Sequence, residues 1–264
     1  MKIAAAVVVA LSLVGGPVLA DDAAAGREIH SRNQAAIVTI QLVVDTTMTM
    51  GGSASTSESK ITTVGTVIDP SGLTVVSLAT MDPSTFARMF LRSMRGGMSA
   101  DSEFKDVKII LADNTELPAA IVLRDRDLDV AFVRPVEKTE KPLAAIDLAT
   151  ARTPRLLDDI VSLNRMGTVA NRAVTVSMHR IEAIVERPRP FYLPSPGGYS
   201  GGGSPVFGMD GAPLGIILIR FAPPDGDSGM SSMPWSLGSL PVVPVVVPAA
   251  ELLDAAKQVL EPAR

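Results

Sequence analysis

The feature that most constrains the fold is a series of short apolar runs that turn-forming residues interrupt at regular intervals. The runs are rich in Val, Ile and Leu, and 21 glycines and 20 prolines supply frequent turns between them. This pattern favours many short strands over a helical bundle, so the sequence predicts an all-β barrel or sandwich. The predicted strands are residues 35–44, 61–68, 73–78, 107–111, 116–123, 129–134, 160–163, 173–176, 181–185, 204–207, 214–221 and 242–247.

The segments between these strands include few predicted helices. Helical spacing of apolar residues predicts a helix over residues 249–260 that closes the chain, and a short helix is expected over residues 85–95. The small, polar residues 21–34 are expected to form an N-terminal tail or a short helix. The predicted irregular segments are residues 46–60, 135–153 and 222–239, of which 135–153 has the character of a connector between two lobes.

The first twenty residues have the pattern of a secretory signal peptide. Lys2 precedes an apolar run over residues 3–14, a Gly-Gly-Pro break follows, and Ala20 ends a small-residue cleavage site. The sequence therefore predicts export, with a mature protein that begins at Asp21. An uncleaved membrane anchor is the alternative, but the apolar run is short for a bilayer span. No other segment is long and apolar enough, so we expect no membrane span after residues 1–20 are removed.

Cysteine usage and charge narrow the class of protein further. The chain contains no cysteine, which rules out disulfides and a lipoprotein anchor next to Ala20. A large disulfide-free exported domain fits a bacterial periplasm or secretion from a bacterium. With a net charge of −4, the chain lacks the excess of basic residues that is typical of nucleic-acid-binding proteins. With two histidines and no cysteine the chain lacks a zinc ligand set, and we expect neither a metal site nor a cofactor.

Five segments occur in an order that is characteristic of one family. The segment Gly198-Tyr199-Ser200-Gly201-Gly202 has the form G-x-S-G-G, which is the nucleophile loop of trypsin-like serine proteases. Taken together, the segments resemble the HtrA/Deg-type branch of that family over roughly residues 35–260. No PDZ domain follows in this sequence, although many members of the branch carry one. The five segments are residues 65–72, 107–126, 129–131, 198–215 and 245–260.

The resemblance implies a specific architecture. Trypsin-like proteases consist of two six-stranded antiparallel β-barrels, and the active site lies in the cleft between them. We therefore expect a peptidase domain over residues 35–260, with a first lobe at about 35–140, a second at about 154–260 and a C-terminal helix.

The resemblance also assigns the catalytic positions, and here the sequence departs from the family. The family's His position falls on Ala79, or on a neighbour if the register slips by one residue, and none of these residues is a base. Its Asp position falls on Asp129. The other reading of Asp129 is a polar residue that satisfies the backbone of a turn.

The nucleophile position is ambiguous. The G-x-S-G-G pattern assigns it to Ser200, with Gly198 and Ser200 as candidate oxyanion-hole donors, but counting back from Pro205 assigns it to Gly202. The apparent insertion Gly203-Ser204 would disturb the backbone N–H groups of an oxyanion hole. Ser200 could also be an ordinary residue of a glycine-rich loop.

The absence of a histidine at the family's His position favours the hypothesis of a catalytically inactive protein. A serine hydroxyl is a poor nucleophile unless a base takes its proton, and the aspartate mainly orients that base. His179 is expected at the turn or start of a second-lobe strand and His30 in the N-terminal segment, so neither is expected to serve.

Three functional readings stay open at this stage. The first is a pseudoprotease that binds protein or peptide segments in the inter-lobe cleft by β-augmentation. The alternative is a divergent serine endopeptidase of HtrA/Deg type that uses Ser200 and Asp129 with an unidentified base. The third is a structural domain without a ligand.

Overall fold

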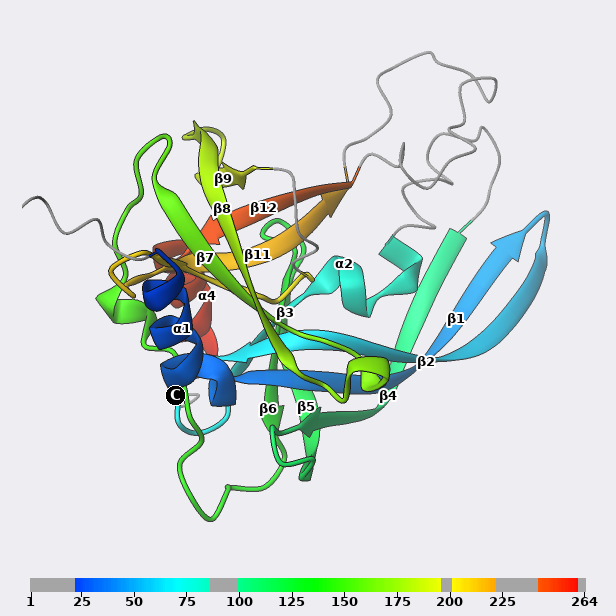
Figure 1. Ribbon diagram of the computed structural model, residues 1–264. Coiled ribbons are helices and arrows are strands. Elements are labelled where there is room, and N and C mark those ends of the chain that lie inside the picture. Colours follow the sequence, from blue (N-terminus) through cyan, green and yellow to red (C-terminus); the bar gives the residue numbers. More distant parts are fainter. Residues whose placement is uncertain (1–21, 86–98, 196–200, 222–241, 261–264) are drawn as a thin grey trace, which may run out of the picture.

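The computed structural model describes residues 22–85, 99–195, 201–221 and 242–260 (Figure 1). They form two closed six-stranded antiparallel barrels and a C-terminal helix, which confirms the predicted fold class. The first barrel has the strand order β1-β2-β3-β6-β5-β4, and the second has the order β10-β11-β12-β9-β8-β7. The first six strands are β1 (Ile37–Met50), β2 (Ser53–Val67), β3 (Thr74–Ser77), β4 (Ser99–Ile110), β5 (Glu116–Asp125) and β6 (Val130–Pro135).

The second barrel follows after a connector, and helices flank both barrels. The N-terminal helix α1 (Asp22–Asn33) lies beside β7 and β8 (Figure 1), and its Ile29 is buried in the shared core. The segment expected as a tail or short helix is therefore a helix docked on the second barrel. The remaining elements are α2 (Leu78–Met81), β7 (Asp159–Arg165), β8 (Val174–Val185), β9 (Phe191–Pro194), β10 (Pro205–Gly208), β11 (Pro213–Phe221), β12 (Val242–Pro248), α4 (Ala249–Leu260) and the 3-10 turns η1 (Gln34–Ala36), η2 (Leu148–Thr150) and η3 (Thr168–Ala170).

The structure corrects the loop predicted over residues 46–60. This segment forms the outer half of a long β1–β2 hairpin, whose register runs unbroken from Ile37↔Thr66 to Met50↔Ser53. Gly51 and Gly52 make the connection with φ of +57° and +84°, the left-handed conformation that a two-residue hairpin turn requires. Serine and threonine suggested a loop, but threonine is β-branched and fits a strand.

Two further predictions in the second barrel need correction. The runs at 173–176 and 181–185 belong to the single strand β8, and His179 lies in its middle rather than at a turn. Strand β9 was not predicted. The signal peptide over residues 1–20, the helix expected over residues 85–95 beyond position 85, and most of the loop at 222–239 lie outside the described residues.

One buried hydrophobic cluster joins the two barrels. It combines side chains from the outer face of the first barrel with others from the second barrel and from α4, so the barrels share a dry interface. Burial of this continuous apolar surface fixes the orientation of one barrel against the other. Its largest members include Ile37, Leu73, Phe132, Leu163, Phe207 and Leu252.

Arg165 adds a polar link at the same interface. Its guanidinium is 7% exposed and donates to three backbone carbonyls, those of Ile37 (2.6 Å), Gln34 (3.1 Å) and Arg172 (2.9 Å). The first two lie at the start of the first barrel, and Arg165 belongs to the second. A buried cation is tolerated here because carbonyl oxygens satisfy its donors.

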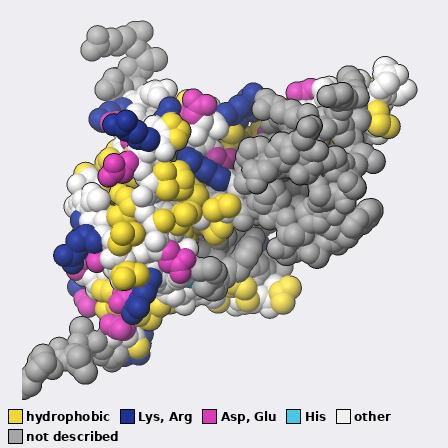
Figure 2. Space-filling model, turned by 90° about the horizontal axis from the view of Figure 1, so that it is seen from above, with side chains coloured by type: hydrophobic (Ala, Val, Ile, Leu, Met, Phe, Trp, Pro, Cys, Tyr) yellow, Lys and Arg dark blue, Asp and Glu magenta, His cyan; other side chains and the backbone are white. Residues whose placement is uncertain are grey.

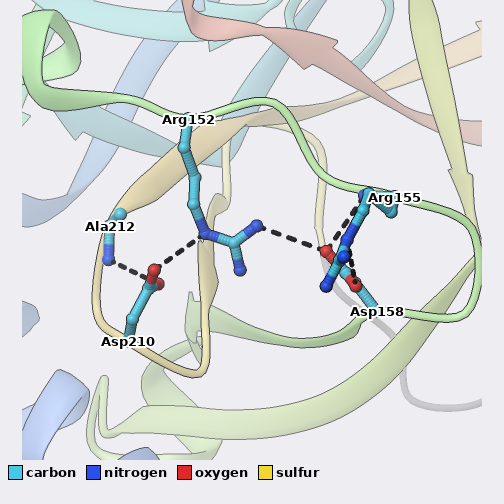
Figure 3. A network of polar contacts seen from close by, with 5 residues as sticks. All are labelled: Arg152, Arg155, Asp158, Asp210 and Ala212. Carbon is cyan, nitrogen blue, oxygen red and sulfur yellow. Dashed lines mark hydrogen bonds and ion pairs between the residues drawn. The ribbon is translucent and has the colours of Figure 1, made fainter.

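The connector between the barrels is held by ion pairs (Figure 3). Arg152 donates to Asp210 in the β10–β11 turn (2.9 Å) and to Asp158 just before β7 (3.3 Å). Asp158 also accepts the backbone N–H of Arg155 (2.9 Å), and Asp210 accepts that of Ala212 (3.2 Å). The backbone N–H of Arg155 and the cation of Arg152 hold the pKa of Asp158 below its usual range. These contacts attach the irregular segment to the second barrel.

The surface is mixed in charge. On the described part of the face in Figure 2, basic and acidic side chains alternate around a hydrophobic area. Among the described residues no helix could span a membrane, and no cluster of three metal-ligating side chains is present.

Candidate functional site

Asp129 is one of the two site residues that the sequence predicted in the first barrel, and the other is Ala79. It precedes β6 in the left-handed conformation (φ +60°), and the β3–β6 pairing places Ser77 opposite Val130. The Asp129 carboxylate accepts hydrogen bonds from the Ser77 hydroxyl at Oδ2 (2.8 Å) and from the Ala79 N–H at Oδ1 (2.9 Å). Ala79 and Asp129 are therefore neighbours in the first barrel, the lobe in which both were expected.

Burial raises the pKa of the Asp129 carboxyl from 3.8 to about 7. The hydrogen bonds from Ser77 and Ala79 and the positive charge of Arg220 favour the ionised form and offset part of this effect. Asp129 thus has the burial of a catalytic aspartate but lacks a titratable partner among the groups that bond to it.

Ser77 is the functional residue that sequence analysis missed. Its hydroxyl donates to Asp129 and accepts the backbone N–H of Ile219 on β11 (3.2 Å), so it links the aspartate to the second barrel. It is fully buried. The sequence carried one weak signal, a lone hydroxyl at the end of the apolar run 73–78.

The side chain that faces the second barrel at this point is that of Thr80. Ala79 directs its backbone N–H at Asp129, whereas a Cβ placed on Gly202 would lie 2.9 Å from Thr80 Cγ2. The Thr80 hydroxyl lies 2.8 Å from that of Thr63 and donates to the Ser77 carbonyl (2.9 Å). The geometry thus offers Thr80 as the neighbouring residue for the His position, and threonine is not a base either.

The glycine loop approaches this site through Gly202. A Cβ at Gly202 would lie 2.7 Å from Ser77 Cβ and 3.0 Å from Ile219 Cγ1, closer than side-chain carbons approach. Gly202 is buried, and no side chain fits at its position without movement of its neighbours. The count back from Pro205 assigned the nucleophile position to Gly202, and that assignment stays a prediction.

The residues after Gly202 are held by hydrogen bonds. Gly203 donates its N–H to the Ile217 carbonyl (2.7 Å) and accepts the Thr66 hydroxyl (2.6 Å), which again joins the barrels. The buried Ser204 hydroxyl donates to Asn164 (3.2 Å). Gly198 and Ser200 lie outside the described residues, so their roles as oxyanion donors and nucleophile stay predictions.

His179 occupies a different environment. It is 7% exposed, and its Nε2 lies 3.2 Å from the hydroxyl of Ser162 on the neighbouring strand β7. Burial lowers the pKa of His179, and the backbone of Ser195 offsets this only in part. His30 lies on the N-terminal helix α1. The contacts of His179 are those of a core histidine.

Strand β11 continues beyond its contacts with Ser77 and Gly202. Beyond Ile217 this strand pairs with β12 on one side, and the described residues supply no strand on the other. The Ile219 N–H points to that open side, because it donates to Ser77. Arg220 on β11 stacks on the ring of Phe191 on β9 at 4.9 Å.

Comparisons with known proteins agree with the architecture. The profile of the trypsin-like peptidase domain family matches residues 33–216, which is more than half of the chain. Among solved structures, 324 chains match. One of them is the HtrA-type protease AlgW with a tripeptide, at a TM-score of 0.56 and 16% identity, covering 89% of this chain and 64% of that one. The chain thus spans less than two thirds of that protease, and the likeness establishes the fold alone. No curated protein matches.

Proposed function

The chain belongs to the trypsin-like peptidase domain family, and we propose that it is an exported, catalytically inactive member that binds extended protein or peptide segments between its barrels. The export part of the proposal rests on residues 2–20, whose charge, apolar run and small-residue site are those of a cleaved signal peptide.

One observation carries the proposed inactivity. In an active member a histidine bonds to the aspartate and takes the proton of the nucleophile. Here the Asp129 carboxylate is bonded to the Ser77 hydroxyl and the Ala79 N–H, and Gly202 packs directly against Ser77 and Thr80. The groups that bond to this carboxylate therefore include no imidazole. Loss of the histidine alone lowers turnover on the order of 10⁶-fold in a model serine protease.

The inactivity is tested with a fluorophosphonate probe, which labels only an activated serine. We expect no labelling and no cleavage of casein above background, with an active trypsin-like protease labelled in parallel as the positive control. Ser200→Ala should leave both results unchanged, and Ala79→His or Thr80→His should not create activity, because Gly202 packs directly against Ser77 and Thr80. Labelling that disappears in Ser200→Ala would instead establish the divergent endopeptidase.

The open edge of β11 supports the proposed binding of segments. Backbone N–H groups alternate along a strand, so Phe221 directs its N–H to the same side as Ile219, toward the cleft. The Ile219 N–H is taken by Ser77, whereas an extended peptide could pair with Phe221 as an added strand.

This binding mode predicts the effect of a single substitution. Phe221→Pro removes the backbone N–H that would donate a hydrogen bond to a peptide carbonyl. Loss of one such hydrogen bond costs about 1.4 kcal/mol, so the affinity for the peptide should fall about tenfold. Binding is measured by fluorescence anisotropy with fluorescein-labelled casein, an unfolded chain. Phe221→Leu keeps the N–H and serves as the matched control. Equal affinity of the Pro and Leu variants would exclude β11 as the docking edge.

A further inference from the structure

The first barrel extends into an arm that the cleft does not use. The outer parts of β1, β2 and β4 form a three-stranded sheet, which projects to the right in Figure 1. Residues 53–60 of β2 are all exposed. Strand β2 pairs with β1 along one edge over its whole length, but with β3 only from Gly65 to Val67. In the described part of the chain, the other edge of β2 from Ser53 onward has no strand partner.

The two edges of the arm differ in their protection. The β4 edge carries the charged residues Asp101, Glu103 and Lys105 at alternate positions, and Asp106 interrupts it with a φ of +46°. Alternating charges and irregular backbone are devices that keep sheet edges from pairing. The β2 edge has no proline and a continuous register, and its residues 53–57 are all Ser, Thr or Ala. Its backbone groups are therefore open to another strand.

The charges of β2 indicate which strand would pair with it. Residues 53–64 contain two charged side chains, Glu58 and Lys60, on either side of Ser59. If two β2 strands run antiparallel about an axis at Ser59, each Glu58 lies opposite Lys60 of the partner subunit. An axis one residue away on either side would place Glu58 opposite its own copy or Lys60 opposite its own copy, and like charges directly opposite are destabilising.

We propose that two copies of this chain associate through β2, antiparallel and two-fold symmetric about Ser59. The ladder would run from Thr56 to Thr62 on each strand. At Val64 the edge is closed, because Gly203 packs against the Val64 carbonyl group. Such a contact is isologous, so it closes a dimer and leaves no further β2 edge open. It lies on the arm and does not depend on peptide binding in the cleft.

A single engineered cysteine tests the register, because the chain contains no other thiol. In Ser59→Cys the two thiols would face each other across antiparallel strands with Cα atoms about 4.5–5.5 Å apart, within disulfide range. We expect a covalent dimer after mild oxidation. Ser57→Cys is the control, equally on the exposed strand, but about 13 Å from its own copy in this register. Equal cross-linking of both variants, or none of either, would overturn the proposal.

Exchange of the charges tests the pairing itself. Glu58→Lys and Lys60→Glu should each weaken the dimer about tenfold in sedimentation equilibrium, because each creates two like-charge pairs across the axis. The double variant restores both opposite-charge pairs and should recover the wild-type affinity. Asp101→Lys on the β4 edge should leave the dimer unchanged. A monomeric wild type, or a double variant as weak as the single ones, would refute the β2 interface.

Discussion

Exchange of Gly203 for alanine is expected to lower the free energy of unfolding by about 4 kcal/mol, the combined cost of a strained backbone and an overpacked contact. Gly203 has a φ of +99°, where L side chains rarely fit. An added Cβ would also lie 2.9 Å from the carbonyl carbon of Val64, so backbone of the first barrel would have to move. Urea denaturation of the wild type and the variant measures the difference.

The matched control for this prediction is Gly167→Ala. Gly167 is exposed with an ordinary φ of −71°, and nothing lies within 4 Å of a Cβ at that position. Its substitution should change the free energy of unfolding by less than about 0.5 kcal/mol. A Gly203→Ala variant as stable as Gly167→Ala would contradict the close approach of the glycine loop to the first barrel.

The second large effect is a dependence of stability on pH that arises from Asp129. Burial raises its pKa in the folded protein from 3.8 to about 7. The folded state therefore binds the proton more tightly than the unfolded state. Its contribution to stability is fully present below about pH 4 and is lost as the pH rises through about 7. A shift of about three pKa units corresponds to about 4 kcal/mol.

The difference between the wild type and Asp129→Asn isolates this contribution, because the other titrating groups are shared. The free energy of unfolding of the wild type should fall relative to that of the variant between pH 4.5 and 8. Asp127→Asn is the control, since the side chain of Asp127 is 82% exposed. A difference between wild type and Asp129→Asn that is constant over this range would show that Asp129 is not buried as described.

Both predictions concern the interface between the two barrels, where Gly203 belongs to the second barrel and Asp129 to the first. Gly203 and Gly202 bring the second barrel against the first, and Asp129 is buried where they meet. Gly202 packs closely against Ser77 and Thr80 at this interface. If Gly203→Ala opens the interface, it should also lower the pKa of Asp129, because desolvation is the largest cause of its shift.

The sequence by itself determined the fold class and the family. Short apolar runs and turn residues are local signals, and they predicted most of the twelve strands of the two barrels. The order of five motifs led to the correct family, and it assigned two catalytic positions to Ala79 and Asp129, which are neighbours in the structure. Motif spacing could do this because β3 and β6 pair directly in this fold, so positions at their ends meet.

Only the tertiary structure decided the rest. Residues 46–60 form strands because β1 pairs with β2 in a hairpin and with β4, which follows about fifty residues later, and this pairing overrides a loop-like composition. The link from Ser77 to Ile219, and the contact of Gly202 with Thr80, join residues more than a hundred positions apart. Packing between the barrels, rather than any local pattern, determines which side chains surround Asp129, and therefore whether the site can hold a base.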